Sequence, residues 1–167
     1  MNGEAARLIS ALQLERHVEG GWFREVYRSE GIIPGESLPE GFSGLRNYCT
    51  SVYFLLQGEE ISSFHRIRSD EIWHYYDGNS PVAVVVLTPE GTQEIRVGKE
   101  LSKGEVFQAV VPAGCWFGAY LINPSGYALV GCTVSPGFDF SDFELASPEK
   151  LAAGFPDSAE VIGKLCK

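Results

Sequence analysis

The spacing of apolar residues predicts one helix near the start of the chain and strands after it. Leu8, Ile9 and Leu12 share one stripe of a short amphipathic helix within residues 3–14. Residues 22–28 are rich in aromatics and valine, and a period of two, which is that of a strand, separates Phe23, Glu25 and Tyr27 from the other four residues. In a regular strand this alternation places Arg24 and Arg28 on the same face.

Short apolar stretches separated by turn residues continue through most of the chain. We expect further strands at residues 48–57, 61–66, 71–76, 82–88, 92–97, 106–111, 115–122 and 127–135. Regular short strands with glycine and proline between them predict an all-β fold, either an antiparallel sandwich or a barrel. Residues 31–44 hold four glycines and two prolines without apolar periodicity, so they are predicted to form a long loop, as in a functional lid or an interface arm.

The end of the chain returns to helical signals. Ser147 is a good N-cap and Pro148 fits the first turn, which predicts a helix there, and a second short helix is expected at residues 158–165. With 167 residues and 44% hydrophobic composition, the chain can bury one core. We therefore expect one domain, with a helix and lead-in over residues 1–21, a barrel over 22–146 and a helical tail over 147–167.

Charge and cysteine content narrow the classes of function. The net charge of −9 repels phosphate backbones and anionic lipid, so nucleic acid and membranes are not expected as partners. No apolar run approaches the roughly 20 residues of a spanning helix, and the N-terminus lacks the pattern of a signal peptide. A cytoplasmic location is expected. The four cysteines are scattered, which predicts reduced thiols instead of disulfides.

The stretch "SSFHRIRSDEIWHYYDG" carries the strongest candidate chemistry. His65 and Glu71 lie on neighbouring predicted strands and are predicted to meet inside the barrel, where the pair could transfer a proton as a base and its partner. A divalent metal at His65 and Glu71 is the alternative, with His74 as a further ligand candidate. Strict alternation, however, places His74 on the face opposite Glu71. No cofactor is expected.

Other candidates would bind a ligand and not react with it. Arg24, and with less support Arg28, could hold an anionic group of a substrate. Tyr53, Trp73, Trp116 and Phe117 are predicted to line an apolar cavity that stacks on a sugar or a planar base.

The same residues resemble a known superfamily. His65, Glu71 and Gly78 match the first cupin motif, in which two histidines, a glutamate and a glycine surround a metal in a small jelly-roll barrel. Gly104 and "VPAGCWFGAY" resemble the second cupin motif, which ends in a third histidine. Ile67 stands at the position of the second ligand histidine and Phe117 at that of the third, so two of four ligand positions are apolar.

A closer resemblance covers nearly the whole chain. The phrases "HVEGGWFREVYRS", "SDEIWHYYDG", "VPAGCWFGAYL" and "PGFDFSDFELA" are similar to the cupin-like family catalogued as domain of unknown function 985. This resemblance implies the cupin double-stranded β-helix, a cavity open at one end and a homodimer. Residues 21–25 also resemble the early strand of the sugar-nucleotide 3,5-epimerases, RmlC-like enzymes that use a histidine base and a tyrosine acid without metal. By that analogy Tyr76, Tyr120 and Tyr127 are candidate proton donors.

Three hypotheses for the function remain open at the level of the sequence. The first is a metal-independent isomerase or epimerase acting on a sugar derivative, such as a sugar nucleotide or sugar phosphate, with His65 as base and Glu71 as its partner. The second is a ligand-binding or sensory cupin without catalysis. The third is a metal-dependent cupin enzyme with a reduced ligand set.

Overall fold

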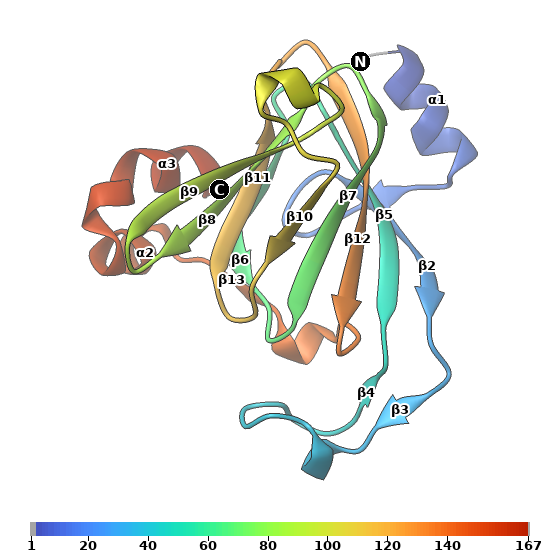
Figure 1. The fold of residues 1–167 in the computed structure, drawn as a ribbon, viewed down its shortest axis with the longest axis vertical. Helices are drawn as coiled ribbons and strands as arrows, with labels where there is room; N and C mark the ends of the chain where they lie inside the picture. Colours follow the sequence, from blue (N-terminus) through green and yellow to red (C-terminus); the bar gives the residue numbers. More distant parts are fainter. Residues whose placement is uncertain (1–2, 167) are drawn as a thin grey trace.

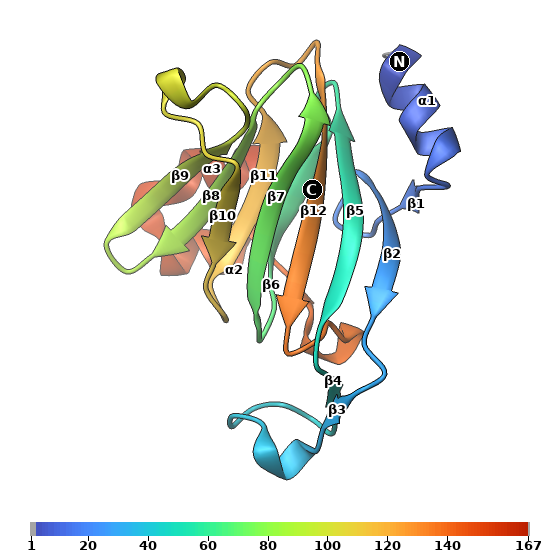
Figure 2. The same cartoon turned by 45° about the vertical axis from the view of Figure 1, so that its right-hand side comes forward.

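The computed structural model describes residues 3–166, in which two antiparallel sheets face each other as a barrel (Figures 1 and 2). The six-stranded sheet has the order β1 (Glu15–Arg16), β2 (Trp22–Arg28), β5 (Thr50–Gln57), β12 (Tyr127–Ser135), β7 (Asp70–Gly78) and β10 (Gln108–Val111). The five-stranded sheet has the order β13 (Glu144–Leu145), β6 (Ile61–Arg66), β11 (Trp116–Leu121), β8 (Val82–Thr88) and β9 (Gly91–Val97). The predicted all-β barrel with short terminal helices is confirmed.

The apolar run of β8 is buried on both faces of its sheet. Val84 and Val86 point into the core between the sheets, whereas Val85 and Leu87 pack under the C-terminal helices. These helices are α2 (Pro148–Gly154) and α3 (Ala159–Leu165), with the 3₁₀ turn η4 (Pro156–Ser158) between them. A strand covered on both sides has no polar face, which explains why its sequence lacks alternation.

Helix α1 (Gly3–Ala11) covers part of the other sheet from outside. Its Ala5 and Leu8 form an apolar cluster with Leu55 of β5 and Leu129 of β12. Among the described residues, no helix is both long enough and apolar enough to cross a membrane.

Strand β2 contains a bulge that changes which side chains face the barrel. Glu25 pairs with Val52 and Tyr27 pairs with Ser51, which leaves Val26 as the extra residue. A bulge reverses the alternation beyond it. The prediction that Arg24 and Arg28 share a face is therefore wrong, because Arg28 points into the barrel beside Glu25 while Arg24 stays outside.

The predicted long loop is an arm that projects from one end of the barrel (Figures 1 and 2). Its two ends pair as β3 (Ile32–Ile33) and β4 (Arg46–Asn47), and the 3₁₀ turn η1 (Gly35–Ser37) lies between them. At its base, the buried Arg46 forms a two-bond ion pair with Asp142, with distances of 2.6 and 2.7 Å. The arm is thereby tied to the 3₁₀ turn η3 (Phe140–Asp142).

Candidate active site

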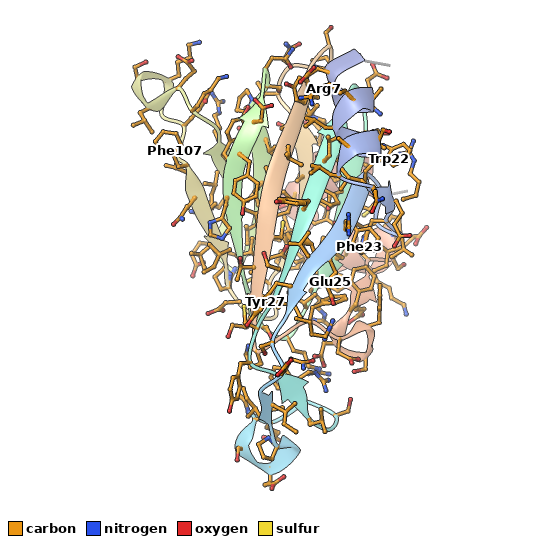
Figure 3. All side chains as sticks on the ribbon, turned by 90° about the vertical axis from the view of Figure 1, so that its right-hand side faces the viewer. Arg7, Trp22, Phe23, Glu25, Tyr27 and Phe107 are labelled. Atoms are coloured by element: carbon orange, nitrogen blue, oxygen red, sulfur yellow. The ribbon has the colours of Figure 1, made fainter. Side chains whose placement is uncertain are left out.

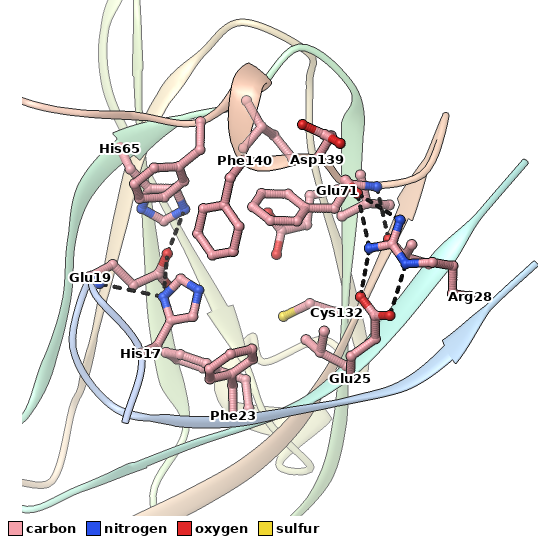
Figure 4. A pocket seen from close by; sticks show the side chains of 17 residues that line it. His17, Glu19, Phe23, Glu25, Arg28, His65, Glu71, Cys132, Asp139 and Phe140 are labelled. Carbon is pink, nitrogen blue, oxygen red and sulfur yellow. Dashed lines mark hydrogen bonds and ion pairs between the residues drawn. The ribbon is translucent and has the colours of Figure 1, made fainter. Parts of the chain in front are cut away.

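A cavity of about 240 Å³ opens at the end of the barrel that carries the arm and η3. Figure 4 shows the 17 residues that line it. They come from the segment before β2, from β2, β5, β6, β7 and β12, from the turn after β6, and from the segment around η3. Phe23 and Phe54 form part of the wall, and Phe138, Phe140 and Phe143 of the η3 segment form the roof. The cavity therefore combines an apolar lining with a small set of ionisable groups.

Glu19 is the centre of the polar cluster in this cavity. It lies between β1 and β2, and its buried side chain reaches three partners. Its Oε2 lies 3.2 Å from Nε2 of His65 and 3.3 Å from Nδ1 of His17, and its Oε1 accepts a 2.8 Å hydrogen bond from Ser62. Burial works against the charged form, but the two imidazoles and the hydroxyl outweigh it and lower the pKa of Glu19. Glu19 is therefore ionised at neutral pH.

Both ring nitrogens of His65 are occupied within the protein. Nδ1 lies 2.8 Å from the carbonyl oxygen of Ser63, and because a carbonyl can only accept, Nδ1 carries a proton. Nε2 faces Glu19, and the ring lies between Phe117 and Phe143, with centroid distances of 4.1 and 5.4 Å. His65 therefore contacts Glu19 and has no ring nitrogen left for a ligand.

His17 has the free ring nitrogen that His65 lacks. Its Nδ1 lies 3.3 Å from the carboxylate of Glu19, and the backbone N–H of Glu19 points at the same nitrogen from 3.4 Å. A lone pair on Nδ1 would accept this long bond from the N–H but repel the ionised carboxylate, whereas a proton on Nδ1 makes a charge-assisted contact with the carboxylate, which is the stronger interaction. We therefore assign the proton to Nδ1. Nε2, which has no protein partner among the described residues, faces the cavity (Figure 4).

Glu71 lines a different part of the cavity, and its pKa is shifted in the opposite direction from that of Glu19. Burial, and in second place the negative charge of Glu19, raise the pKa of Glu71 to about 8, although a hydrogen bond with Cys132 lowers it in part. Burial also raises the pKa of the Cys132 thiol well above its ordinary value. At neutral pH, Glu71 is a protonated acid and Cys132 a neutral thiol.

Arg28 is the cation at the edge of the cavity, and it is fully bonded. Its Nε and Nη2 donate to the two oxygens of Glu25 at 2.9 and 2.7 Å. Nη1 donates to Asn47 at 2.9 Å, and both terminal nitrogens donate to the carbonyl oxygen of Phe138 at 3.1 Å. These bonds hold the roof segment against β2.

The structure separates the residues that the sequence groups together as candidates. His65 and Glu71 line the same cavity, but the ion-pair partner of His65 is Glu19 and not Glu71. His17 and Glu19 were not predicted from the sequence. A histidine and a glutamate two residues apart, directly before the glycines of "HVEGGWF", were the available signal.

Arg28 is the predicted ligand-binding residue that lines this cavity, whereas seven other candidates for ligand binding or proton donation lie outside its lining. Trp73 and Phe117 face inward but are packed in the core. The remaining five, on outer faces of the barrel, are Arg24, Tyr53, Tyr76, Trp116 and Tyr120. Alternation shows which residues of a strand share a face, but not where along the barrel a cavity opens.

Outer-face contacts explain these five positions. Arg24 donates to Leu12 and Gln13 at the end of α1, and the rings of Tyr53 and Tyr76 pack at 6.0 Å. Trp116 and Tyr120 pack under the C-terminal helices, where Tyr120 also donates to Glu94. Tyr127, a candidate donor by analogy, packs beside α1.

The donor set does not fit the metal that the cupin motif implies. Ile67 and Phe117, at two of the four ligand positions, are buried apolar residues, and both nitrogens of His65 are taken. His74 lies on the outer face, as alternation predicted, where its ring contacts Thr133 and Gln108. Within residues 3–166, no group of three or more histidine, cysteine, aspartate or glutamate side chains is arranged to hold a metal ion.

Comparison with known proteins identifies the family. A family model described as cupin superfamily, domain of unknown function 985, matches residues 6–146. The chain belongs to this cupin family. An uncharacterized protein of Saccharomyces cerevisiae is 32% identical over 165 residues, which cover 87% of this chain and 82% of the yeast protein.

Two solved structures are similar to this cupin along nearly their full length. A hypothetical protein from Leishmania major has 33% sequence identity and a TM-score of 0.87, with 97% of this chain and 98% of that chain covered. A protein from Shewanella oneidensis has 40% identity and a TM-score of 0.85, with 98% and 97% covered. Membership of the cupin superfamily supports the binding of a small molecule in the barrel.

Proposed function

We propose that this cupin is a metal-independent isomerase that moves a proton next to a carbonyl group of a small sugar-like compound. The observation that carries the proposal is the pair of buried carboxyl groups in one cavity, whose pKa values are driven in opposite directions. At one and the same pH, one carboxyl group of this pair is ionised and the other holds its proton, as acid–base catalysis requires.

In this proposal, His17 is the general base. Its Nε2 is open to the cavity, and Glu19 holds the ring through Nδ1 and stabilises the imidazolium that forms when Nε2 takes a proton. His65 and Ser62 hold Glu19 in place. His65 is therefore proposed as a positioning residue, which replaces the role as base expected from the sequence.

Glu71 is the general acid. While Nε2 of His17 takes the proton from the carbon that bears a hydroxyl group, Glu71 donates its proton to the neighbouring carbonyl oxygen, and an enediol forms. His17 then returns its proton to the former carbonyl carbon, and the ionised Glu71 recovers a proton from the other enediol hydroxyl. The net result exchanges the positions of the carbonyl and the hydroxyl, with all protons balanced.

The test is incorporation of solvent deuterium into a set of uncharged aldoses, ketoses and smaller hydroxycarbonyl compounds, followed by proton NMR. The wild-type protein should introduce deuterium at the carbon next to the carbonyl in at least one compound. The His17→Asn variant should lose this exchange by about a hundredfold or more, since general-base catalysis contributes on that order. Asparagine keeps a donor toward Glu19, which favours folding.

The matched control is His74→Asn, because His74 belongs to β7, the strand of Glu71, but its side chain lies on the outer face of the barrel. This variant should exchange deuterium at the wild-type rate. If compounds bind and none exchanges deuterium in the wild-type protein, the proposal fails and the non-catalytic ligand-binding function takes its place.

A further inference from the structure

The lining of the cavity has no cation free to bind an anion. Arg28 is the one arginine among the described lining residues, and lysine is absent from them. A guanidinium has five N–H groups. All five are used by Glu25, Asn47 and Phe138, through the bonds given above. An incoming phosphate or carboxylate would have to displace one of these partners.

Carboxyl groups outnumber cations around the same space. Besides Glu19, Glu25 and Glu71, the lining includes Asp139, which accepts hydrogen bonds from the hydroxyl and the backbone N–H of Ser141 at 2.6 and 2.8 Å. These two bonds lower the pKa of Asp139, so it is ionised at neutral pH. The two imidazoles both contact Glu19, so each already has a carboxylate partner within the protein.

The volume of the cavity restricts the ligand further. At about 240 Å³ it lies below the range of roughly 300–1,000 Å³ that is typical of pockets for drug-sized ligands. One sugar-sized ring fits such a space, and phenylalanine faces suit the C–H face of that ring. A nucleotide attached to the ring would lie outside.

We infer that the part of the ligand inside the cavity is a single uncharged ring or short polyhydroxy carbonyl compound, and that Glu25 determines this specificity by occupying Arg28. The inference rests on the proposed function for the identity of the reacting groups. A sugar nucleotide or sugar phosphate, the class expected from the sequence, would have to keep its phosphate at the mouth. The exclusion acts through the ionised carboxylate of Asp139 in the lining and through a guanidinium without a free donor.

The first experiment releases Arg28. In the Glu25→Ala variant, Nε and Nη2 of Arg28 lose the carboxylate to which they donate. Inorganic phosphate is then titrated at constant ionic strength, and NMR chemical-shift changes at Arg28 report its binding. The matched control is Glu144→Ala, which releases Arg66 from a similar exposed pair outside the cavity. Both pairs are partly exposed, so both variants should fold.

Glu25→Ala should bind phosphate about tenfold or more tightly than the wild-type protein, the ratio expected when charge-assisted hydrogen bonds become available. The gain should disappear in the double variant Glu25→Ala with Arg28→Gln, and Glu144→Ala should show no such gain at Arg28. Two results would overturn the inference: saturable binding of phosphate at Arg28 in the wild-type protein, or no gain in Glu25→Ala over the control.

A second experiment separates this inference from the proposed isomerase function. Matched pairs of compounds, such as glucose with glucose 6-phosphate, are compared for binding and for deuterium exchange. Binding of the uncharged members without any exchange would refute the isomerase and leave the charge specificity standing. Exchange into the phosphorylated member only would refute the charge specificity and leave the isomerase standing.

Discussion

Oε2 of Glu19 lies 3.2 Å from Nε2 of His65, and this contact joins two segments that are 46 positions apart in the chain. The other nitrogen of His65 donates to the carbonyl oxygen of Ser63, so Nε2 is the nitrogen that faces the carboxylate. The same carboxylate oxygen also contacts His17. One carboxylate thus orients two imidazoles, of which only that of His17 keeps a ring nitrogen free for a ligand among the described residues.

Replacing Glu19 with glutamine should destabilise the protein. The variant removes the negative charge that both imidazoles contact, and we expect the free energy of unfolding to fall by about 2–4 kcal/mol at pH 7. Urea unfolding measures this loss. The exposed Glu144→Gln should cost about 1 kcal/mol or less, and equal losses in the two variants would contradict the central role of Glu19.

The same Glu19→Gln variant should make Glu71 more acidic. The charge of Glu19 is the second cause of the raised pKa of Glu71, after burial. Without that charge, the midpoint of the Glu71 carboxyl titration should move below about 8 but remain above its ordinary value, because the burial persists. Carbon-13 NMR of labelled glutamate side chains measures the midpoint. An unchanged midpoint would show that the two carboxyl groups do not interact.

Glu71 should make the protein less stable as the pH rises. Between the ordinary pKa of 4.5 and the folded-state pKa of about 8, the unfolded chain is ionised at Glu71 while the folded chain still holds the proton. The folded state binds more protons in this window, so the free energy of unfolding falls as the pH increases, by up to a few kcal/mol in total. Above about pH 8 this contribution no longer changes.

The measurement is urea unfolding of the wild-type protein and of Glu71→Gln at pH 5, 6.5 and 8. Glutamine cannot titrate, so the difference in stability between the variant and the wild-type protein should shift in favour of the variant as the pH rises. A difference that is constant over this range would mean that the pKa of Glu71 is not raised by folding.

Breaking the buried ion pair between Arg46 and Asp142 should lower the free energy of unfolding more than breaking an exposed ion pair. Asp142→Asn leaves the guanidinium of Arg46 buried beside a neutral group, and we expect a loss of about 3–5 kcal/mol. Hydrogen exchange should also accelerate at residues 138–143, because Asp142 connects this segment to the base of the arm. Glu144→Gln, which breaks the exposed pair with Arg66, should leave both measurements almost unchanged.

Two glycines of neighbouring strands should differ in their tolerance of alanine. At Gly78, which has a φ of +149°, a Cβ atom would collide with the backbone of Tyr127 and Ala128, so Gly78→Ala should cost about 2–4 kcal/mol. At Gly131 the obstacle is the ring of Tyr76, which is 52% exposed and can move aside. Thermal unfolding should show a clearly smaller loss for Gly131→Ala, and equal losses would contradict this account.

The sequence predicts the strands well because local patterns encode them. The ranges predicted for β2, β6, β8 and β12 coincide with the observed strands, and the alternation of β7 correctly separates His74 from Glu71. The short strands β1 and β13 leave no such pattern, since each has only two residues, both exposed.

The candidate site was harder to predict because its partners are distant in the chain. Alternation places His65 and Glu71 on inner faces, but nothing local indicates that the lead-in residues His17 and Glu19 fold back onto β6. The aromatic wall was predicted from Tyr53, Trp73, Trp116 and Phe117, of which Trp116 packs on the outside under the C-terminal helices. The phenylalanines around η3, to which no lining role was assigned from the sequence, form the roof instead.

The bulge at Val26 also makes a prediction about chain length. Because Val26 is unpaired, its deletion would straighten β2 and still leave Glu25 and Arg28 pointing to the same side, now two positions apart. Removal of one residue is therefore tolerable at this point of the strand. Relatives of this cupin that are one residue shorter here should keep the same two side chains turned inward.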